Sequence, residues 1–256
     1  MREAFFKFRT GDRKQASAPE GVRLYAIGDI HGRLDLLESM LGEIERDQTG
    51  RDGRPVTLIF LGDYIDRGPD SKGVVSRLIR GFSHNYTPVF IKGNHEALLL
   101  SFLDDPSTGR AWVRSGGDDT LLSYGLSLET IRLACWDGSN RMAETCRQFR
   151  AMLPEDHLHF YANLKLYCRF GDYFFTHAGV RPKVPLDRQS EEDLLWIRKE
   201  FLASTEDFGA IVVHGHTPNR EPQEQRNRIG LDTYAVRTGK LTACGFEDSK
   251  RWFLST

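Results

Sequence analysis

The chain has few cysteines, almost no net charge and no long apolar run. Only 4 of the 256 residues are Cys, and none forms a C-x-x-C pair, which argues against a disulfide framework and a thiolate metal site. Lys and Arg number 35 and Asp and Glu 36, so the net charge of −1 argues against a nucleic-acid partner. No segment approaches the roughly 20 apolar residues that a membrane-spanning helix needs, so no membrane partner is expected.

The N-terminal segment, residues 1–20, is expected to be a polar lead-in to the fold. Lys7 and Arg9 interrupt its three Phe residues, so it lacks the continuous apolar region of a secretory signal. Together with the scattered thiols, this predicts a reducing, cytoplasmic environment. The rest of the chain, residues 21–256, is predicted to form one domain, for which 39% hydrophobic residues supply a core of ordinary size.

Three units of strand, loop and helix open this domain. Apolar runs at 22–27, 56–61 and 87–92 each end in a polar loop that contains Gly, and apolar positions with helical spacing follow each loop. Strands that alternate with helices favour a mainly parallel sheet. In such sheets ligands bind at the carboxyl ends of the strands, where all three polar loops fall.

The alternation stops at about residue 104. We expect a mainly helical insertion over about 104–160, followed by strands at 164–170, 172–176 and 210–213. The spacing of apolar residues predicts a short helix over 194–201. The last part of the chain is predicted to form closing antiparallel strands at 229–236, 241–246 and 252–254.

Side chains that can bind metal ions follow five of the predicted strands. They are Asp29, His31, Asp63, Asn94, His95, His177, His214 and His216. A single Asp at a strand end is more simply explained as a helix N-cap, but this explanation does not extend to the whole set. Oxygen and imidazole donors without thiolate suit Mn, Fe or Zn. Because these donors outnumber the four of a single zinc site, they favour two metal ions bridged by one carboxylate.

The same strand ends carry five short motifs. They read Gly28-Asp29-Ile30-His31-Gly32, Gly62-Asp63-Tyr64-Ile65-Asp66-Arg67-Gly68, Gly93-Asn94-His95-Glu96, His177-Ala178-Gly179 and Gly215-His216-Thr217-Pro218. In this order they resemble the motifs of the calcineurin-like metallophosphoesterases, and more narrowly those of the phosphoprotein phosphatase branch, of the bacterial serine/threonine protein phosphatase type. The resemblance implies an α/β fold, a four-layer α/β/β/α sandwich of two mixed sheets with the metal ions at one edge.

The resemblance also implies which residues bind the metal ions. Asp29 and His31 would hold the first ion and Asp63 would bridge both. The second ion would be completed by Asn94, His177 and His216. We expect two divalent ions, with manganese supporting activity and iron or zinc also compatible with these donors. The implied reaction is hydrolysis of a phosphate ester by direct attack of metal-bound hydroxide.

Four further residues receive roles from the same resemblance. His95 would protonate the leaving oxygen as general acid, and Asp66 would hold its other ring nitrogen. Arg67 would bind two phosphate oxygens through its planar guanidinium. Arg198 is the candidate for a second phosphate-binding arginine, with Arg181 and Arg188 as nearby competitors.

Several other residues are assigned to the fold. We expect His214 to pack beside the site or support a ligand, Glu96 to be a charge in the first turn of a helix, and His84, His157 and His159 to be surface or structural residues. Asp232 belongs to a late family pattern in which Tyr234 replaces the usual Gly, and it is not expected to bind metal.

One helical stretch resembles a segment of the bacterial members of the family. It carries Trp112, Gly116, Gly117, Thr120 and the tripeptide 123–125. Two interpretations stay open for it. Its residues either line the substrate cleft or only pack helices together.

Three classes of function are possible. The first is hydrolysis of phosphoserine or phosphothreonine in proteins, and the alternative is a symmetrical bis(5'-nucleosyl)-tetraphosphatase acting on diadenosine tetraphosphate. The partner is therefore a phosphoprotein or a phosphorylated small molecule. The third possibility is a catalytically inactive binding module, and the presence of every expected ligand and of His95 argues against it.

Overall fold

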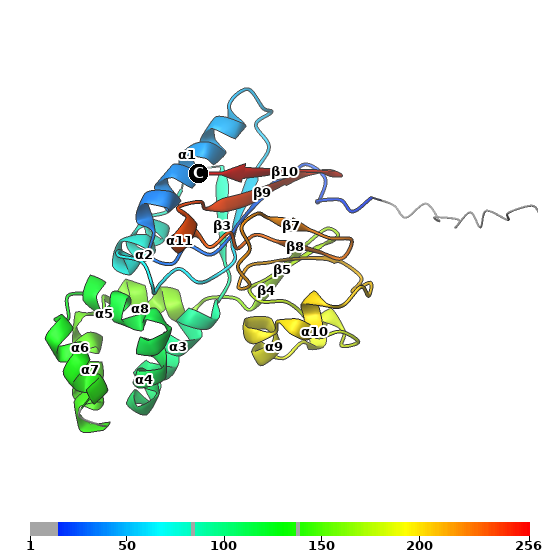
Figure 1. The fold of residues 1–256 in the computed structure, drawn as a ribbon. Helices are drawn as coiled ribbons and strands as arrows, with labels where there is room; N and C mark the ends of the chain where they lie inside the picture. The colour runs from blue at the N-terminus through cyan, green and yellow to red at the C-terminus, as the bar shows by residue number, and fades with distance from the viewer. Residues whose placement is uncertain (1–14, 83–84, 137–138) are drawn as a thin grey trace, which may run out of the picture.

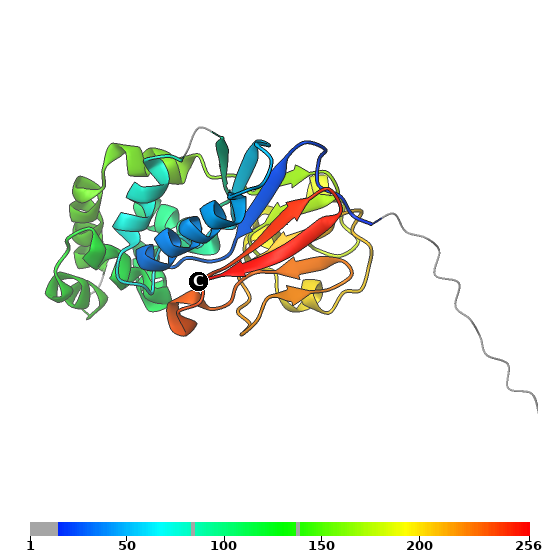
Figure 2. The same cartoon turned by 90° about the horizontal axis from the view of Figure 1, so that it is seen from above.

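Two mixed β-sheets form the centre of the molecule, shown in Figures 1 and 2 by a computed structural model that describes residues 15–82, 85–136 and 139–256. The first sheet has the order β10-β9-β1-β2-β3, with bounds β1 Arg23–Ile27, β2 Val56–Phe60, β3 Tyr86–Phe90, β9 Thr242–Glu247 and β10 Lys250–Ser255. The second has the order β4-β5-β6-β8-β7, with bounds β4 Tyr167–Phe170, β5 Tyr173–Thr176, β6 Ile211–His214, β7 Gln223–Glu224 and β8 Arg228–Gly230.

The parallel strands of each sheet lie next to one another. β1, β2 and β3 run parallel, and Ile27, Phe60 and Phe90 lie side by side at their carboxyl ends. β5, β6 and β8 are likewise parallel, whereas β4 and β7 are antiparallel edges. Because the parallel strands end together, the loops that follow them begin at a common edge of each sheet.

Alternating side chains give each sheet two apolar faces. In β1, Leu24 and Ala26 pack in the core between the two sheets, and Tyr25 and Ile27 pack in the core under the helices of the first sheet. In β5, Tyr173 and Phe175 face the first sheet. Phe174 points to the opposite face of the second sheet, where it packs in a third core with Leu194 and Phe201.

Helices cover both outer faces. On the first sheet lie α1, Leu34–Gln48, and α2, Ser71–Ile79. On the second lie α9, Glu191–Trp196, and α10, Lys199–Leu202, which follow the short η3, Leu186–Arg188. α1 is amphipathic and buries Leu36, Leu37, Met40, Leu41 and Ile44 at helical spacing. The predicted four-layer α/β/β/α sandwich of two mixed sheets is confirmed.

A group of helices connects β3 to β4 and lies at one end of the molecule in both views. Its members are α3 Asn94–Asp104, η1 Pro106–Thr108, α4 Gly109–Trp112, η2 Val113–Gly117, α5 Asp118–Ser123, α6 Leu128–Trp136, α7 Ser139–Met152 and α8 Glu155–Ala162. Residues of this group, such as Leu99 and Phe149, share one core with Leu58 and Val75. We therefore propose that these helices belong to the same domain as the sheets.

Two predicted elements differ from the structure. The strand expected at 229–236 ends at Gly230, runs parallel to β6, and is followed by α11, Ala235–Thr238. The change of direction occurs at Tyr234, whose φ of 60° is left-handed. The single helix expected over 194–201 is two short helices, because Ile197 has ψ 140° and Arg198 has φ −133° and ψ −85°.

Some predictions fall outside the described residues. These are the first fourteen positions of the lead-in, and His84. Within the part of the chain that is described, no helix has the length and apolar character to cross a membrane.

Candidate active site

The loops after five strands bring the predicted metal-binding residues together. Those that follow the first sheet's strands are Asp29, His31, Asp63 and Asn94, and those that follow β5 and β6 are His177 and His216. All six side chains are buried. Both sheets therefore contribute donors to one site, which lies where their parallel strands end.

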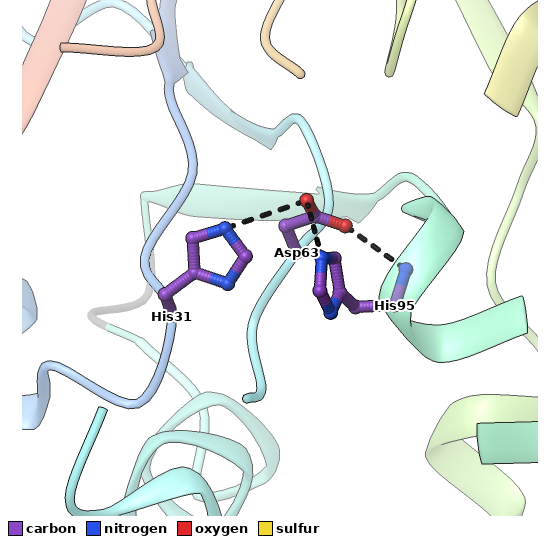
Figure 3. A group of neighbouring side chains, drawn as sticks. All are labelled: His31, Asp63 and His95. Atoms are coloured by element: carbon purple, nitrogen blue, oxygen red, sulfur yellow. Dashed lines mark hydrogen bonds and ion pairs between the residues drawn. The ribbon is translucent and has the colours of Figure 1, made fainter. Parts of the chain in front are cut away.

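Asp63 lies at the centre of this site. Figure 3 shows His31 and His95 directed at its carboxylate, with His31 Nε2 3.5 Å and His95 Nε2 3.8 Å from Asp63 Oδ2. On the other side, His177 Nε2 lies 3.4 Å from Asp63 Oδ1. The two oxygens of one carboxylate thus face two different groups of donors, as a bridging ligand requires.

Three donor atoms converge on the second side of Asp63. His177 Nε2 and His216 Nδ1 are 3.1 Å apart, and Asn94 Oδ1 lies 2.9 Å from the first and 2.8 Å from the second. Together with Asp63 Oδ1 they form a compact set of nitrogen and oxygen donors. A divalent ion suits such a set, which contains no sulfur.

Backbone carbonyls fix which ring nitrogen of two histidines points into the site. His31 Nδ1 donates to Ile65 O at 2.9 Å, and His177 Nδ1 donates to Leu61 O at 2.8 Å. Each Nε2 therefore carries the lone pair with which it can bind a metal ion. In His216 it is Nδ1 that faces the other donors.

The protonation states also fit metal binding. Burial lowers the pKa of His31 to about 3 and that of His216 to about 2, so both imidazoles are neutral at physiological pH. Burial opposes the ionisation of Asp63, but the surrounding imidazoles, with His177 the largest contributor, hold its pKa well below the usual range. Neutral imidazole and ionised carboxylate are the forms that bind cations.

Two further buried carboxyl groups, those of Asp29 and Asp232, lie near Asp63. Asp29 accepts a hydrogen bond from the backbone N of His216 at 3.0 Å, and burial together with neighbouring Asp232 and Asp63 raises its pKa. Asp232 is itself buried, and its Oδ1 accepts from the backbone N of Tyr234 at 2.8 Å. This concentration of buried carboxylates is compatible with bound cations, which would neutralise it. The sequence did not indicate that Asp232 lies so close.

His95 and Asp66 form a buried pair next to Asp63. His95 Nδ1 lies 2.6 Å from Asp66 Oδ2, so the ring's Nε2 points into the site. Although burial opposes it, the carboxylates of Asp63 and Asp66 raise the pKa of His95. Arg67 places Nη1 2.9 Å from His31 Nε2 and Nη2 2.8 Å from His95 Nε2. Its guanidinium therefore lies between the candidate ligand and the candidate acid.

The second arginine lies at the break between α9 and α10. Arg198 is exposed, and its Nη1 donates to Thr217 Oγ1, next to His216, at 3.4 Å. Its competitor Arg181 is already paired with Asp193 through Nε and Nη2 of its guanidinium. Arg198 therefore contacts a residue next to a candidate metal ligand, and it stays the candidate for the second phosphate-binding arginine.

The backbone of the site adopts conformations that are unusual for residues with side chains. His31, Asp63, Asp66, Arg67 and His216 have left-handed φ values of 46°, 51°, 73°, 66° and 63°. Such conformations cost of order 1–3 kcal/mol each and concentrate at functional sites. They aim neighbouring side chains of one short loop in different directions.

Glu96 has a larger role than the sequence suggested. It does lie in the first turn of α3, but it is fully buried rather than a solvated helix charge. Its Oε2 accepts from the backbone N of Asp63 and Gly93, both at 2.9 Å, and its Oε1 accepts from Tyr64 N at 2.8 Å. Glu96 thus fixes the loop that carries Asp63. Its place in the Gly-Asn-His-Glu motif was the available signal.

The remaining histidines with described positions lie outside the site. His214 is buried, donates from Nδ1 to Gly215 O at 3.0 Å and packs edge-on against the ring of Phe201. His157 is buried beside Tyr124, and His159 is exposed on α8. These positions agree with their assignment to packing or surface.

Two mixed sheets with buried metal-binding donors at their common edge are the arrangement expected of a metallophosphoesterase. Residues 22–244 match the family described as Metallophos, calcineurin-like phosphoesterase. The chain belongs to this family, whose members use pairs of divalent metal ions, and it is a phosphoester hydrolase.

Named relatives cover most of the chain. It is 28% identical over 243 residues to bis(5'-nucleosyl)-tetraphosphatase PrpE [asymmetrical] of Anoxybacillus flavithermus, covering 87% of this chain and 89% of that protein. It is 26% identical over 227 residues to serine/threonine-protein phosphatase 1 of Salmonella typhimurium, covering 86% and 89%. A crystal structure described as a proposed diadenosine tetraphosphatase has the same fold, with a TM-score of 0.61 at 24% identity over 93% of this chain and 98% of that one.

Proposed function

We propose that the protein is a dinuclear-metal phosphatase that hydrolyses phosphomonoesters, with phosphoserine and phosphothreonine in proteins as its first substrate class. The observation that carries this proposal is the buried His95–Asp66 pair beside the donors around Asp63. An alcohol is a far poorer leaving group than a nucleotide phosphate, so it gains most from a positioned general acid. The contact with Asp66 holds the ring so that Nε2 is directed into the site, as such an acid needs.

Six residues would hold the metal ions in this proposal. They are Asp29 and His31 for one ion, Asn94, His177 and His216 for the other, and Asp63 for both. Bound there, the ions would activate a water molecule and stabilise negative charge on the phosphate. The converging donor atoms and their protonation states support this assignment. Manganese is the ion we propose, and iron or zinc would suit the same donors.

The other site residues would handle the substrate and a proton. Arg67 and Arg198 would each bind phosphate oxygens. To do so, Arg67 would give up its contacts with the ring nitrogens of His31 and His95. His95 would then donate the proton on Nε2 to the leaving oxygen, while Asp66 keeps Nδ1 protonated and the ring in place. We also propose a cytoplasmic location, supported by four cysteines that are all free.

A second candidate substrate is a dinucleoside tetraphosphate. It is favoured by relatives such as the bis(5'-nucleosyl)-tetraphosphatases PrpE of Anoxybacillus flavithermus and Bacillus velezensis, both asymmetrical in name. The sequence suggested a symmetrical cleavage. Symmetrical hydrolysis of diadenosine tetraphosphate would release two molecules of ADP, whereas asymmetrical hydrolysis would release ATP and AMP, so the products identify the reaction.

A substrate panel tests the proposal. The chain is stripped with a chelator, reloaded separately with manganese, iron or zinc, and assayed with a phosphoserine peptide and with diadenosine tetraphosphate. Faster release of phosphate from the peptide supports the first class, and faster nucleotide release supports the second. Asp63→Asn should lose bound metal and activity together. Hydrolysis of neither substrate, or an unchanged rate in Asp63→Asn, would refute the two-metal phosphatase.

A further inference from the structure

Two residues of the helical group between β3 and β4 reach the carboxylate of Asp66. Trp112, the last residue of α4, donates from Nε1 to Asp66 Oδ2 at 2.9 Å. Thr120, in α5, donates from Oγ1 to Asp66 Oδ1 at 2.6 Å. Both side chains are fully buried, as is Asp66, so neither can line an open substrate cleft. For Trp112 and Thr120, this removes the interpretation that they line the substrate cleft.

These contacts fix the orientation of the carboxylate. Oδ2 is shared by the indole N–H of Trp112 and by His95 Nδ1, and Oδ1 is held by Thr120. The backbone N of Asp66 donates in turn to Thr120 Oγ1 at 2.9 Å and to Ser71 Oγ at 3.1 Å. Because Asp66 has a left-handed φ of 73°, its loop depends on such external contacts to keep its shape.

We propose that Trp112 and Thr120 are positioning residues for His95. They hold the plane of the Asp66 carboxylate, which holds the imidazole ring so that Nε2 faces the leaving oxygen. This inference rests on the proposed function, because it assumes that His95 is the general acid. It assigns to the helical group a task in the chemistry as well as in packing.

Packing alone would not need these polar atoms. The ring of Trp112 stacks obliquely on Phe102 and Phe149, with centroids 5.1 and 5.9 Å away. Trp112→Phe keeps an aromatic ring in this cluster and removes the N–H. Thr120→Val keeps the shape of the side chain and removes the hydroxyl, and Thr120→Ser keeps the hydroxyl.

The test compares two leaving groups. p-Nitrophenol leaves without protonation, whereas a serine side chain needs the acid. We expect Trp112→Phe and Thr120→Val each to lower kcat for a phosphoserine peptide by about tenfold or more and kcat for p-nitrophenyl phosphate by less than about threefold. KM for both substrates and the manganese content should stay unchanged. Thr120→Ser should restore the rate on the peptide.

Tyr124→Phe is the matched control. Its hydroxyl lies in the same helical group and contacts His157 Nδ1 at 2.6 Å and Tyr161 OH at 3.0 Å, but not Asp66. It should leave the ratio of the two rates unchanged. In a His95→Ala background, where no acid remains to be positioned, Trp112→Phe should have no further effect on this ratio.

Several outcomes overturn the inference. They are equal losses on both substrates, no loss on either, the same change of ratio in Tyr124→Phe, or a further change of ratio in the His95→Ala background. The failure of the proposed function has a different signature, since the unmodified enzyme would then not hydrolyse the phosphoserine peptide.

Discussion

Gly215 should not tolerate even a methyl group, because the residue packs against Asp29. A Cβ at this position would lie 1.9 Å from Asp29 Oδ1. An ordinary contact begins near 3.4 Å, so Gly215→Ala requires a displacement of about 1.5 Å of the carboxylate or of the loop. Metal–ligand distances tolerate only about 0.2 Å. The substitution should therefore remove Asp29 from the proposed metal site.

We expect Gly215→Ala to lose about one manganese ion per chain and to lower kcat by roughly 100-fold or more. Metal is measured by mass spectrometry after gel filtration, and kcat with p-nitrophenyl phosphate. The control is Gly42→Ala in α1, where a Cβ meets nothing within 4 Å. It should gain about 1 kcal/mol of stability and keep full activity. Normal metal content and kcat in Gly215→Ala would refute the assignment of Asp29 as a ligand.

Three further substitutions test other parts of the structure. In Glu96→Gln, the side-chain amide cannot accept hydrogen bonds at both ends, so at least one buried backbone N–H loses its partner. We expect the free energy of unfolding to fall by about 1–3 kcal/mol and Tm to fall by about 2–4 °C per kcal/mol, and an unchanged Tm would contradict this. In Gly116→Ala a Cβ would lie 2.6 Å from Arg67 Cγ, and displacement of that arginine should raise KM by roughly tenfold, so an equal KM would argue against its role. Burial lowers the pKa of His214 to about 4, so below pH 6.5 the unfolded chain binds a proton that the folded chain does not. The free energy of unfolding, measured by urea titration at each pH, should therefore fall by about 2 kcal/mol more between pH 7 and pH 5 than in His214→Gln. An equal fall in the two proteins would count against this.

The sequence predicted the four-layer sandwich through resemblance to a known family, and its parallel strands through periodicity. Alternating apolar residues mark strands, and the polar loops between Gly residues mark their carboxyl ends. The same loops identified the candidate ligands, because Asp, Asn and His at several strand ends exceed what capping would explain. Local pattern was sufficient here because each motif combines the end of a strand with the side chain that acts there.

Other features depend on contacts that no local pattern contains. The prediction of one helix over 194–201 was wrong. Apolar residues have helical spacing there, yet the helix is interrupted at Ile197 and Arg198. Tyr234 adopts a left-handed conformation without being Gly, while its N–H bonds to Asp232.

Long-range contacts were the other missing information. The contacts of Trp112 and Thr120 with Asp66 join positions 46 and 54 residues apart, and the sequence carries no sign of such pairs. The burial of Trp112 and Thr120, which only the structure shows, distinguishes a residue that supports Asp66 from one that lines the substrate cleft.

The division of the ligands between the two sheets has a consequence for stability. Asn94 follows a strand of the first sheet, and His177 and His216 follow strands of the second. An ion held by these three would act as a cross-link between the layers, in a chain whose cysteines form no disulfide. At a free concentration 1,000 times its Kd, such an ion stabilises the folded state by about 4 kcal/mol. Removing it with a chelator should lower Tm, so the ion that serves the reaction would also stabilise the packing of the two sheets.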